Sequence, residues 1–515
     1  MFIDGRNVPD GTVIETDLAI IGAGAAGITI AREMRNSGFK VTLIESGGLD
    51  FEADTQALYQ GENKGVDYPL DGARLRYFGG STNHWGGWCR PLADIDFEER
   101  DWLPHSGWPI TRSDLNPFYE RAQDLCQLGS TDFDDHEGWR RQANLQPIPL
   151  AGEDVVTRYF IFSQPTRFGE VYRSDIRQAQ NVSTYLHSNV TEIMPDATAS
   201  KVDRLDVATL AGNRFTIRPK LCVLATGGIE NARMLLLSNS IQRAGLGNGH
   251  DLVGRYFMEH VHVPGQVAYI AIRDHKLIPD HYHAATQIGS VSMRAVLMLS
   301  DDFLRREKLM GTNMALYPMR APLSDRQDGD DSPDALEPGV LQLLRSADID
   351  DDDQESAAQS SQEMIFGISC ATEQAPLPDS RVTLSHQRDA LGLQRTSLSW
   401  RPSSIDHHHL SRNLAAVARA FGAWGKADVR ILFSHEGVWQ EAETGWGCHH
   451  MGTTRMSVNP KHGVVDADCK VHGLANLYVA GSSVFTTGGA VNPTLTVVAL
   501  ALRLSDHLKS LTLNG

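Results

Sequence analysis

Short apolar runs and one helical pattern organise the first part of the chain. Leu18–Ile21 form an apolar run with the length of a buried strand, and apolar positions then recur at helical spacing as far as Met34. A second apolar run extends from Val41 to Ile44 and ends at Glu45. This order predicts a strand, a helix and a second strand, which is the βαβ unit of a parallel sheet.

Further along the chain, strand and helix patterns follow one another. Alternating apolar and polar positions predict strands in three segments: 181–193, 202–225 and 265–320. Residues 111–127 predict a helix, with Ser113 or Asp114 near its N-cap. Another helix is predicted at Pro493–Leu508, because proline is favoured in the first turn.

One segment has neither pattern. Residues 324–361 contain the acidic stretches SDRQDGDDSPDAL and ADIDDDDQESAAQSS, whose composition is typical of solvated low-complexity sequence. The segment is expected to be a mobile surface insertion within a mixed domain. A loop that docks a partner or gates a site is the alternative.

The glycines after the first predicted strand indicate a nucleotide site. Gly22, Gly24 and Gly27 have the G-x-G-x-x-G spacing, which allows a tight turn and a close approach of a pyrophosphate to a helix N-terminus. Glu45 ends the second strand, where an acidic side chain can hold ribose hydroxyls. The pattern predicts a Rossmann-like dinucleotide domain and does not distinguish FAD from NAD.

Composition and charge exclude several classes of protein. The chain has 515 residues, which predicts at least two domains, and its net charge is −17, from 47 Lys+Arg and 64 Asp+Glu. An acidic chain without basic clusters is not expected to bind nucleic acid or anionic membranes. No basic segment followed by an apolar one opens the chain, and no apolar run reaches the length of a membrane span. A cytoplasmic location is therefore expected.

The cysteines and histidines do not have the spacing of a metal site. The six cysteines are scattered without a CxxC pair, which is typical of reduced thiols. Cys448, His449 and His450 are adjacent and lack a second cluster of ligands. The run His407–His409 is expected to open a helix on the surface. No metal is predicted.

Four blocks of sequence together are similar to a known family. They are the glycine turn with Glu45; GGSTNHWGG at 79–87; LATGGIENARMLL at 224–236 with VGRYFMEH at 253–260; and HHMGTTRM at 449–456 with NLYVAGSSVFTTGGAVNPTLT at 476–496. The chain resembles the glucose–methanol–choline (GMC) flavoprotein oxidoreductases, in particular the branch of pyranose 2-oxidase and the bacterial glycoside 3-oxidases (dehydrogenases). The resemblance covers nearly the whole chain and is weakest in the centre.

This resemblance implies an α/β fold with a Rossmann-like FAD-binding domain and a discontinuous α+β substrate domain on a mixed or antiparallel sheet. The implied division is 1–110 and 201–260 for the FAD domain, 111–200 for a mixed connection, 261–440 for the substrate domain, and 441–515 for a C-terminal part of the FAD domain that carries the catalytic pair.

The resemblance also implies an activity. FAD would accept a hydride from a secondary hydroxyl group, at C3 or C2 of a sugar or glycoside, which becomes a ketone. A GMC enzyme for a non-sugar alcohol is one alternative, and a flavoprotein subunit of an electron-transfer complex is another. The electron acceptor, whether oxygen, a quinone or a redox protein, stays open, as does the oligomeric state.

Two residues match the catalytic pair of the family. His449 lies three residues before Gly452 and is expected to be the base, since a neutral imidazole suits removal of a hydroxyl proton. Asn492 is expected to donate a hydrogen bond to the substrate oxygen. His450, the neighbour of His449, is expected to have a structural role because adjacent residues of an extended chain face opposite ways.

The other site residues are expected to contact FAD: Gly22, Gly24, Gly27, Glu45, Gly80, Asn83, His84, Val190, Gly481, Ser482 and Thr494. His84 aligns with the histidine to which pyranose 2-oxidases attach FAD covalently. Gly86, which stands where that enzyme has a polar residue, leaves both the covalent bond and the position of oxidation open. Val190 could equally be an ordinary core residue.

Overall fold

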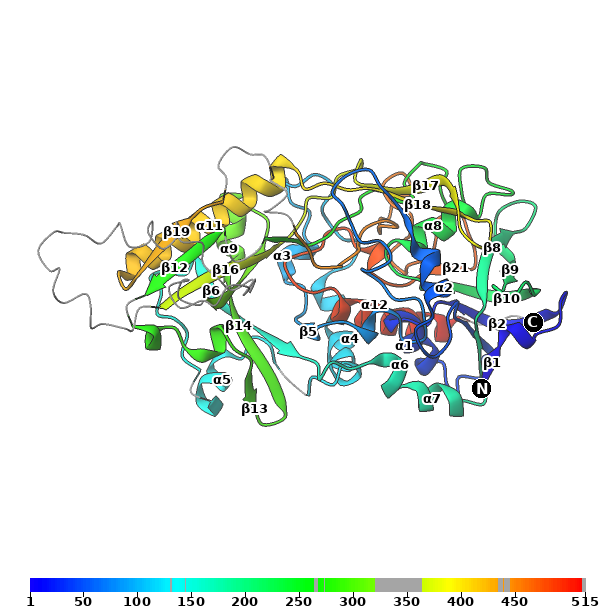
Figure 1. Cartoon of the computed structure of the whole chain (residues 1–515), viewed down its shortest axis with the longest axis horizontal. Helices are drawn as coiled ribbons and strands as arrows, with labels where there is room; N and C mark the ends of the chain where they lie inside the picture. The colour runs from blue at the N-terminus through cyan, green and yellow to red at the C-terminus, as the bar shows by residue number, and fades with distance from the viewer. Residues whose placement is uncertain are drawn as a thin grey trace, which may run out of the picture.

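The protein consists of two large sheets that lie side by side along its long axis, and the first strand and the last helix of the described residues both belong to the same half (Figure 1). The computed structural model describes residues 1–129, 132–143, 145–263, 267–272, 274–319, 364–433, 439 and 445–511. The acidic segment 324–361 lies outside these residues. Within the described residues, no helix has the length and apolar character needed to cross a bilayer.

The first sheet has eight strands and a parallel centre. Its order is β1 (Phe2–Asp4), β7 (Val182–Leu186), β3 (Val41–Ile44), β2 (Val13–Ile21), β10 (Arg214–Leu224), β9 (Val202–Ala208) and β8 (Asn189–Pro195), with β21 (Leu477–Val479) also paired to β10. The strands from β1 to β10 and β21 are parallel, whereas β9 and β8 are antiparallel. Leu18–Ile21 and Val41–Ile44 are buried on both faces, as parallel strands are, and this explains their continuous apolar runs.

Three helices pack together beside this sheet. They are α1 (Ala25–Glu33), α4 (Arg112–Leu125) and α12 (Thr494–Ser510). The N-cap of α4 is Thr111 rather than Ser113 or Asp114; its hydroxyl accepts from the Asp114 N–H, and Asp114 accepts from the Thr111 N–H in return. In a capping box the acidic residue is the third residue of the helix and not the cap itself, which is why Asp114 lies inside α4 and Thr111 is the N-cap. Short helices lie in the connections between strands: α2 (Ala53–Gln56), α3 (Asp94–Phe97), α5 (His136–Ala143), α6 (Phe168–Val171), α7 (Arg173–Gln178) and α8 (Glu230–Leu237).

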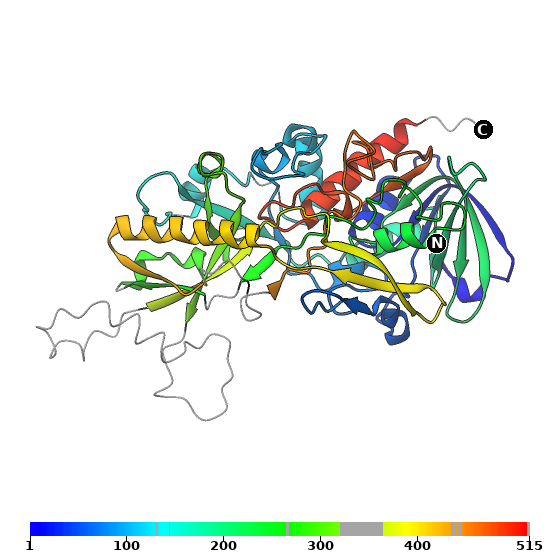
Figure 2. The ribbon, with the colours of Figure 1, turned by 90° about the horizontal axis from the view of Figure 1, so that it is seen from above.

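The second sheet has ten strands, and every pair in it is antiparallel. Its order is β19 (Ala427–Ile431), β12 (Ala268–Ile272), β16 (Met364–Thr372), β15 (Thr312–Met319), β14 (Val291–Leu299), β6 (Val155–Phe162) and β5 (Trp88–Cys89), with β11 (Val261–Val263), β20 (Gly445–Trp446) and β13 (Thr286–Ile288) at its sides. The long helix α11 (Ser404–Trp424) runs across it (Figure 2). The helix α9 (Asp301–Glu307) connects β14 and β15.

The predicted fold class is confirmed: a Rossmann-like sheet stands beside an antiparallel substrate-domain sheet that the chain visits discontinuously. β5 and β20 belong to this second sheet although they come from 1–110 and 441–515. Segment 111–200 supplies β6 to one sheet and β7 and β8 to the other. A third sheet of β17 (Arg381–Arg388), β18 (Gln394–Ser399) and β4 (Gly61–Asn63) lies at the side of the first sheet.

The run His407–His409 opens a helix as expected, but it is not a surface feature. His407 and His409 are 3% and 6% exposed, and only His408 is exposed. The His407 ring stacks on Phe433 at 4.4 Å between centroids. His407 is covered by Phe433 and Trp439, which lie outside the helix and whose contact the local sequence does not reveal.

Candidate active site

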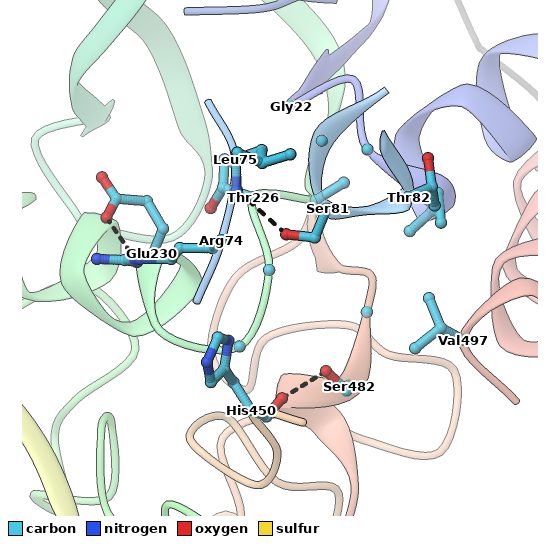
Figure 3. A pocket seen from close by; sticks show the side chains of 18 of the residues that line it. Gly22, Arg74, Leu75, Ser81, Thr82, Thr226, Glu230, His450, Ser482 and Val497 are labelled. Carbon is cyan, nitrogen blue, oxygen red and sulfur yellow. Dashed lines mark hydrogen bonds and ion pairs between the residues drawn. The ribbon is translucent and has the colours of Figure 1, made fainter. Parts of the chain in front are cut away.

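A cavity of about 450 Å³ opens at the carboxyl ends of the parallel strands, between the two sheets. This is the edge where open α/β sheets bind ligands. Its walls come from distant parts of the chain: the turn at 21–26, the loops at 72–76 and 80–88, the segment 225–230, and the C-terminal loops at 447–450, 480–482 and 492–494. In Figure 3 the Ser482 hydroxyl group donates a hydrogen bond to the His450 carbonyl oxygen, and Arg74 lies beside Glu230.

The three glycines of the G-x-G-x-x-G motif have different structural roles. Gly22 has φ +100°, and a Cβ there would lie 2.6 Å from the Ala225 carbonyl oxygen. A Cβ on Gly27 would lie 1.8 Å from the Gly22 oxygen, so Gly27 lets α1 pack directly on the turn and does not line the cavity. Gly24, the N-cap of α1, has open space beside it and lines the cavity. This open helix N-terminus is the kind that receives a pyrophosphate.

Glu45 lies in the cavity wall and holds the glycine turn. Its carboxylate accepts hydrogen bonds from the backbone N–H groups of Ala23 (2.9 Å) and Gly47 (3.0 Å). Burial raises the pKa of Glu45, and these two backbone donors act in the opposite direction. A carboxylate has about four acceptor positions, so capacity remains for a ribose hydroxyl.

The loop at 79–88 covers one side of the cavity. Gly80 and His84 line it, whereas Asn83 does not: the Asn83 amide donates to the Phe78 carbonyl oxygen at 3.1 Å and thereby holds the loop. Burial, followed by the charge of Arg167, lowers the pKa of His84, so this imidazole is neutral near neutral pH. Of the other predicted contacts, Val190, Gly481, Ser482 and Thr494 all line the cavity.

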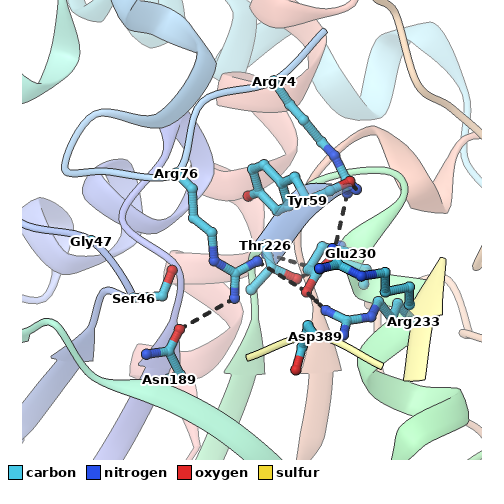
Figure 4. A network of polar contacts seen from close by, with 12 residues as sticks. Ser46, Gly47, Tyr59, Arg74, Arg76, Asn189, Thr226, Glu230, Arg233 and Asp389 are labelled. Atoms are coloured by element: carbon cyan, nitrogen blue, oxygen red, sulfur yellow. Dashed lines mark hydrogen bonds and ion pairs between the residues drawn. The ribbon is translucent and has the colours of Figure 1, made fainter. Parts of the chain in front are cut away.

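A buried cluster of charges lies beside the cavity (Figure 4). Glu230 pairs with the guanidinium groups of Arg233 (2.8 Å), Arg76 (3.2 Å) and Arg74 (3.4 Å), and Arg233 also pairs with Asp389 at 2.6 Å. Burial raises the pKa of Glu230, but the charges of Arg233, Arg76 and Arg74 outweigh it and lower the pKa to about 2. Arg74, Arg76 and Glu230 line the cavity, whereas Arg233 and Asp389 lie behind them, so the cluster fixes this part of the wall.

The two residues predicted to be the catalytic pair meet in the cavity wall. The Asn492 amide nitrogen lies 3.1 Å from Nε2 of His449, although 43 positions separate them in the chain. Asn492 directly precedes Pro493, the N-cap of α12, and the first turn of this helix also lines the cavity. A helix N-terminus favours developing negative charge nearby.

The electrostatic surroundings keep His449 neutral. Burial is the first cause, and the neighbouring His260, His262 and His450 add to it, so the pKa of His449 lies well below its usual value. A neutral imidazole can accept a proton at the nitrogen that carries no hydrogen. The arrangement therefore provides a base beside an amide donor.

Two residues near the pair were missed by reasoning from sequence. Glu259 is fully buried, and its carboxylate accepts from the His449 N–H (2.7 Å), the His260 N–H (2.9 Å) and the Tyr68 hydroxyl (2.6 Å). Burial raises the pKa of Glu259 to about 7, against these donors. His260 places its Nδ1 2.8 Å from Nδ1 of His449. Both residues belong to the block VGRYFMEH, whose match to the family was the available signal.

His450 contacts neighbouring side chains and also lines the cavity. Its Nε2 lies 2.7 Å from the Tyr68 hydroxyl, which donates its own proton to Glu259, and its ring stacks on Phe257. The main chain of His450 is fixed from the other side by Ser482. Both contacts hold the loop that presents His449.

Comparison with known proteins shows similarity to FAD-dependent oxidoreductases. A family model described as GMC oxidoreductase matches residues 376–501, and one described as FAD dependent oxidoreductase matches residues 17–246. The chain is 25% identical to 2-methyl-1,2-propanediol dehydrogenase of Mycolicibacterium austroafricanum, over 96% of this chain and 95% of that one. It is 26% identical to C-glycoside 3-oxidase of Microbacterium trichothecenolyticum, over 70% of this chain and 58% of that one.

The fold is similar to that of solved flavoprotein structures. A formate oxidase superposes with a TM-score of 0.59 at 15% identity, and the match covers 98% of this chain and 99% of that chain. At this identity the similarity shows the fold alone.

Proposed function

We propose that the chain is a GMC-type FAD-dependent oxidoreductase that acts on CH–OH groups and that its substrate is a sugar or glycoside. A secondary hydroxyl group, at C3 or C2, would be oxidised to a ketone. The main observation in support of this reaction is that the side chains of His449 and Asn492 lie within hydrogen-bond distance in the wall of the cavity. The name of the C-glycoside 3-oxidase relative supports the sugar class.

The residues present fit FAD. The open N-terminus of α1 at Gly24 suits the pyrophosphate, and Glu45, which lines the same cavity, suits a ribose. The first turn of α12, from Thr494, lies beside the catalytic pair at the other end of the cavity. When bound there, FAD supplies the acceptor for the hydride that leaves the substrate carbon.

The protein side chains perform the rest of the reaction. The Asn492 amide donates a hydrogen bond to the substrate oxygen and so orients the hydroxyl group. His449 accepts the hydroxyl proton at Nε2, which becomes necessary as the carbon loses its hydride and the oxygen becomes a carbonyl.

Anaerobic mixing of the purified holoprotein with glucosides, free sugars and simple diols tests the substrate class. Bleaching of the flavin band by a glucoside or sugar, with a keto product at C3 or C2, is the expected result. The second candidate is a non-sugar alcohol, favoured by the match to 2-methyl-1,2-propanediol dehydrogenase over 96% of this chain. Bleaching by diols alone would establish it and overturn the sugar assignment.

Gly27→Ala is expected to give protein without bound FAD, because its Cβ would lie 1.8 Å from the Gly22 oxygen and push α1 off the turn. The ratio of flavin absorbance to protein absorbance measures this. Gly422→Ala is the matched control: Gly422 lies within α11, nothing lies within 4 Å of an added Cβ, and the flavin content should not change. Full flavin content in Gly27→Ala would contradict the assigned cradle.

His84 is proposed to carry FAD through a covalent bond, since its neutral imidazole lines the cavity. Acid precipitation should leave the flavin with the unaltered protein, whereas His84→Ala should release it to the supernatant. Release from the unaltered protein would show that the cofactor is held noncovalently and that His84 only packs against it.

A further inference from the structure

His260 lies behind His449 and outside the cavity lining. It is 1% exposed and directly precedes β11. Its Nδ1 lies 2.8 Å from Nδ1 of His449, and its Nε2 lies 2.9 Å from the Gly489 carbonyl oxygen and 3.3 Å from that of Gly488. The two imidazoles and the Asn492 amide thus form one chain of hydrogen bonds, which runs from the buried His260 to the half-buried His449 and Asn492.

The direction of this chain is fixed at its far end. Carbonyl oxygens only accept, so Nε2 of His260 must carry its hydrogen and donate to Gly489. Burial lowers the pKa of His260, so the ring is neutral and its Nδ1 carries no hydrogen. Nδ1 of His449 must then be the donor in the contact between the two rings. Nε2 of a neutral His449 is left without a hydrogen and accepts from Asn492.

The opposite direction of hydrogen bonding would bring buried acceptor atoms together without a hydrogen between them. A hydrogen on Nε2 of His449 would require Nδ1–H on His260, and the bare Nε2 of His260 would then face two carbonyl oxygens. Two acceptors held at hydrogen-bond distance without water cost free energy. Only one direction gives every contact a donor and an acceptor.

One carboxylate sets the spacing of the two rings. Glu259 accepts from the backbone N–H of His260 at 2.9 Å and from that of His449 at 2.7 Å. The two main chains are therefore joined at a single buried point. Gly447 allows this close arrangement, since a Cβ there would lie 2.7 Å from Nδ1 of His449.

We propose that His260 is a positioning residue that holds His449 in the tautomer whose Nε2 is free to take the substrate proton. The inference deepens the proposed function and rests on His449 being its base. When Nε2 takes the proton, the Nδ1–H of His449 remains donated to His260, so the charged ring keeps its partner. No proton passes through His260.

Two variants of His260 separate tautomer control from simple packing. His260→Phe keeps a ring but removes the acceptor for His449 and the donor to Gly489, and it should slow anaerobic flavin reduction by about 10- to 100-fold, the cost of a lost buried partner. His260→Asn places an amide oxygen close to the position of Nδ1, so it restores the acceptor for His449 but not the donor to Gly489, and it should recover part of the rate. Both should keep their FAD.

His281→Phe is the control for the loss of a buried imidazole. His281 is 4% exposed, its ring lies beside those of Tyr159 and Tyr282, and it does not line the cavity. This variant does not change the chain of donors, so the rate should stay near that of the unaltered protein. A loss equal to that of His260→Phe would overturn the role of the hydrogen bond.

Neutron diffraction from deuterium-exchanged crystals of the holoenzyme, at about pH 8 where ordinary imidazoles are neutral, shows the tautomer directly. Deuterium on Nδ1 of His449 and on Nε2 of His260 is expected; deuterium on Nε2 of His449 would overturn the proposal. The outcomes separate the two claims. If His449→Ala kept normal flavin reduction, the proposed function would fail. If His449 proved essential but His260→Phe reduced flavin normally, only the positioning role would fail.

Discussion

His449→Ala should slow anaerobic flavin reduction by about 10²- to 10⁴-fold, the usual contribution of a positioned general base. The reason is geometric, because Nε2 of His449 carries no hydrogen and lies 3.1 Å from the Asn492 amide nitrogen in the cavity wall, where the substrate hydroxyl group is expected. The FAD content should not change, since the cofactor contacts lie on other elements. Stopped-flow absorbance at the flavin band, with the best substrate of the panel, measures the rate.

His408→Ala is the control for this measurement. His408 is exposed on α11, and its removal should leave both flavin content and reduction unchanged. Reduction of His449→Ala at the rate of the unaltered protein would show that another group removes the hydroxyl proton.

Glu230→Gln should lower the free energy of unfolding by about 3–5 kcal/mol at neutral pH, as expected when one partner of a buried ion cluster is removed. Glu230 is 2% exposed and pairs with Arg74, Arg76 and Arg233, whose charges would lose their main counter-ion. Denaturant unfolding of the holoprotein, followed by tryptophan fluorescence, measures the change.

The lowered pKa of Glu230 also predicts how the free energy of unfolding depends on pH in acid. The folded-state pKa of Glu230, about 2, lies below its ordinary value of 4.5, so its contribution is present above pH 4.5 and is lost as pH falls from 4.5 toward 2. Glu230→Gln should therefore lose less stability than the unaltered protein across this range. Glu120→Gln, at an exposed position of α4, should behave like the unaltered protein. Equal acid sensitivity of Glu230→Gln would contradict the assigned pKa.

The parallel core could be predicted because its sequence signal is local. Val41–Ile44 is the strand β3 with the predicted bounds, and the glycine turn follows β2 as expected. Continuous apolar runs, turn glycines and a terminal acid are all read within about thirty residues. The capping of α4 was misplaced by two or three positions because three neighbouring polar residues can each cap a helix.

The two-residue strands and the surroundings of His449 could not be predicted in this way. β5 and β20 are too short to show periodicity, and their membership of the antiparallel sheet depends on partners far along the chain. His449 and Asn492 were found through a family resemblance, whereas the partnership of His449 with His260 depends on the direction of hydrogen bonds between segments 189 positions apart. Sequence spacing carries no information about that direction.

The placement of β21 and α12 has a consequence for how the protein is made. β10 leaves the ribosome long before β21, its parallel neighbour, and before α12, which packs on α1 and α4. Translation proceeds at roughly 5–20 residues per second, so β21 and α12 are synthesised on the order of tens of seconds after β10. During this time the first sheet lacks β21 and its helical layer is incomplete. Since Asn492 and the first turn of α12 also close the cavity, the nascent chain passes through an aggregation-prone stage that the cofactor cannot yet fully stabilise.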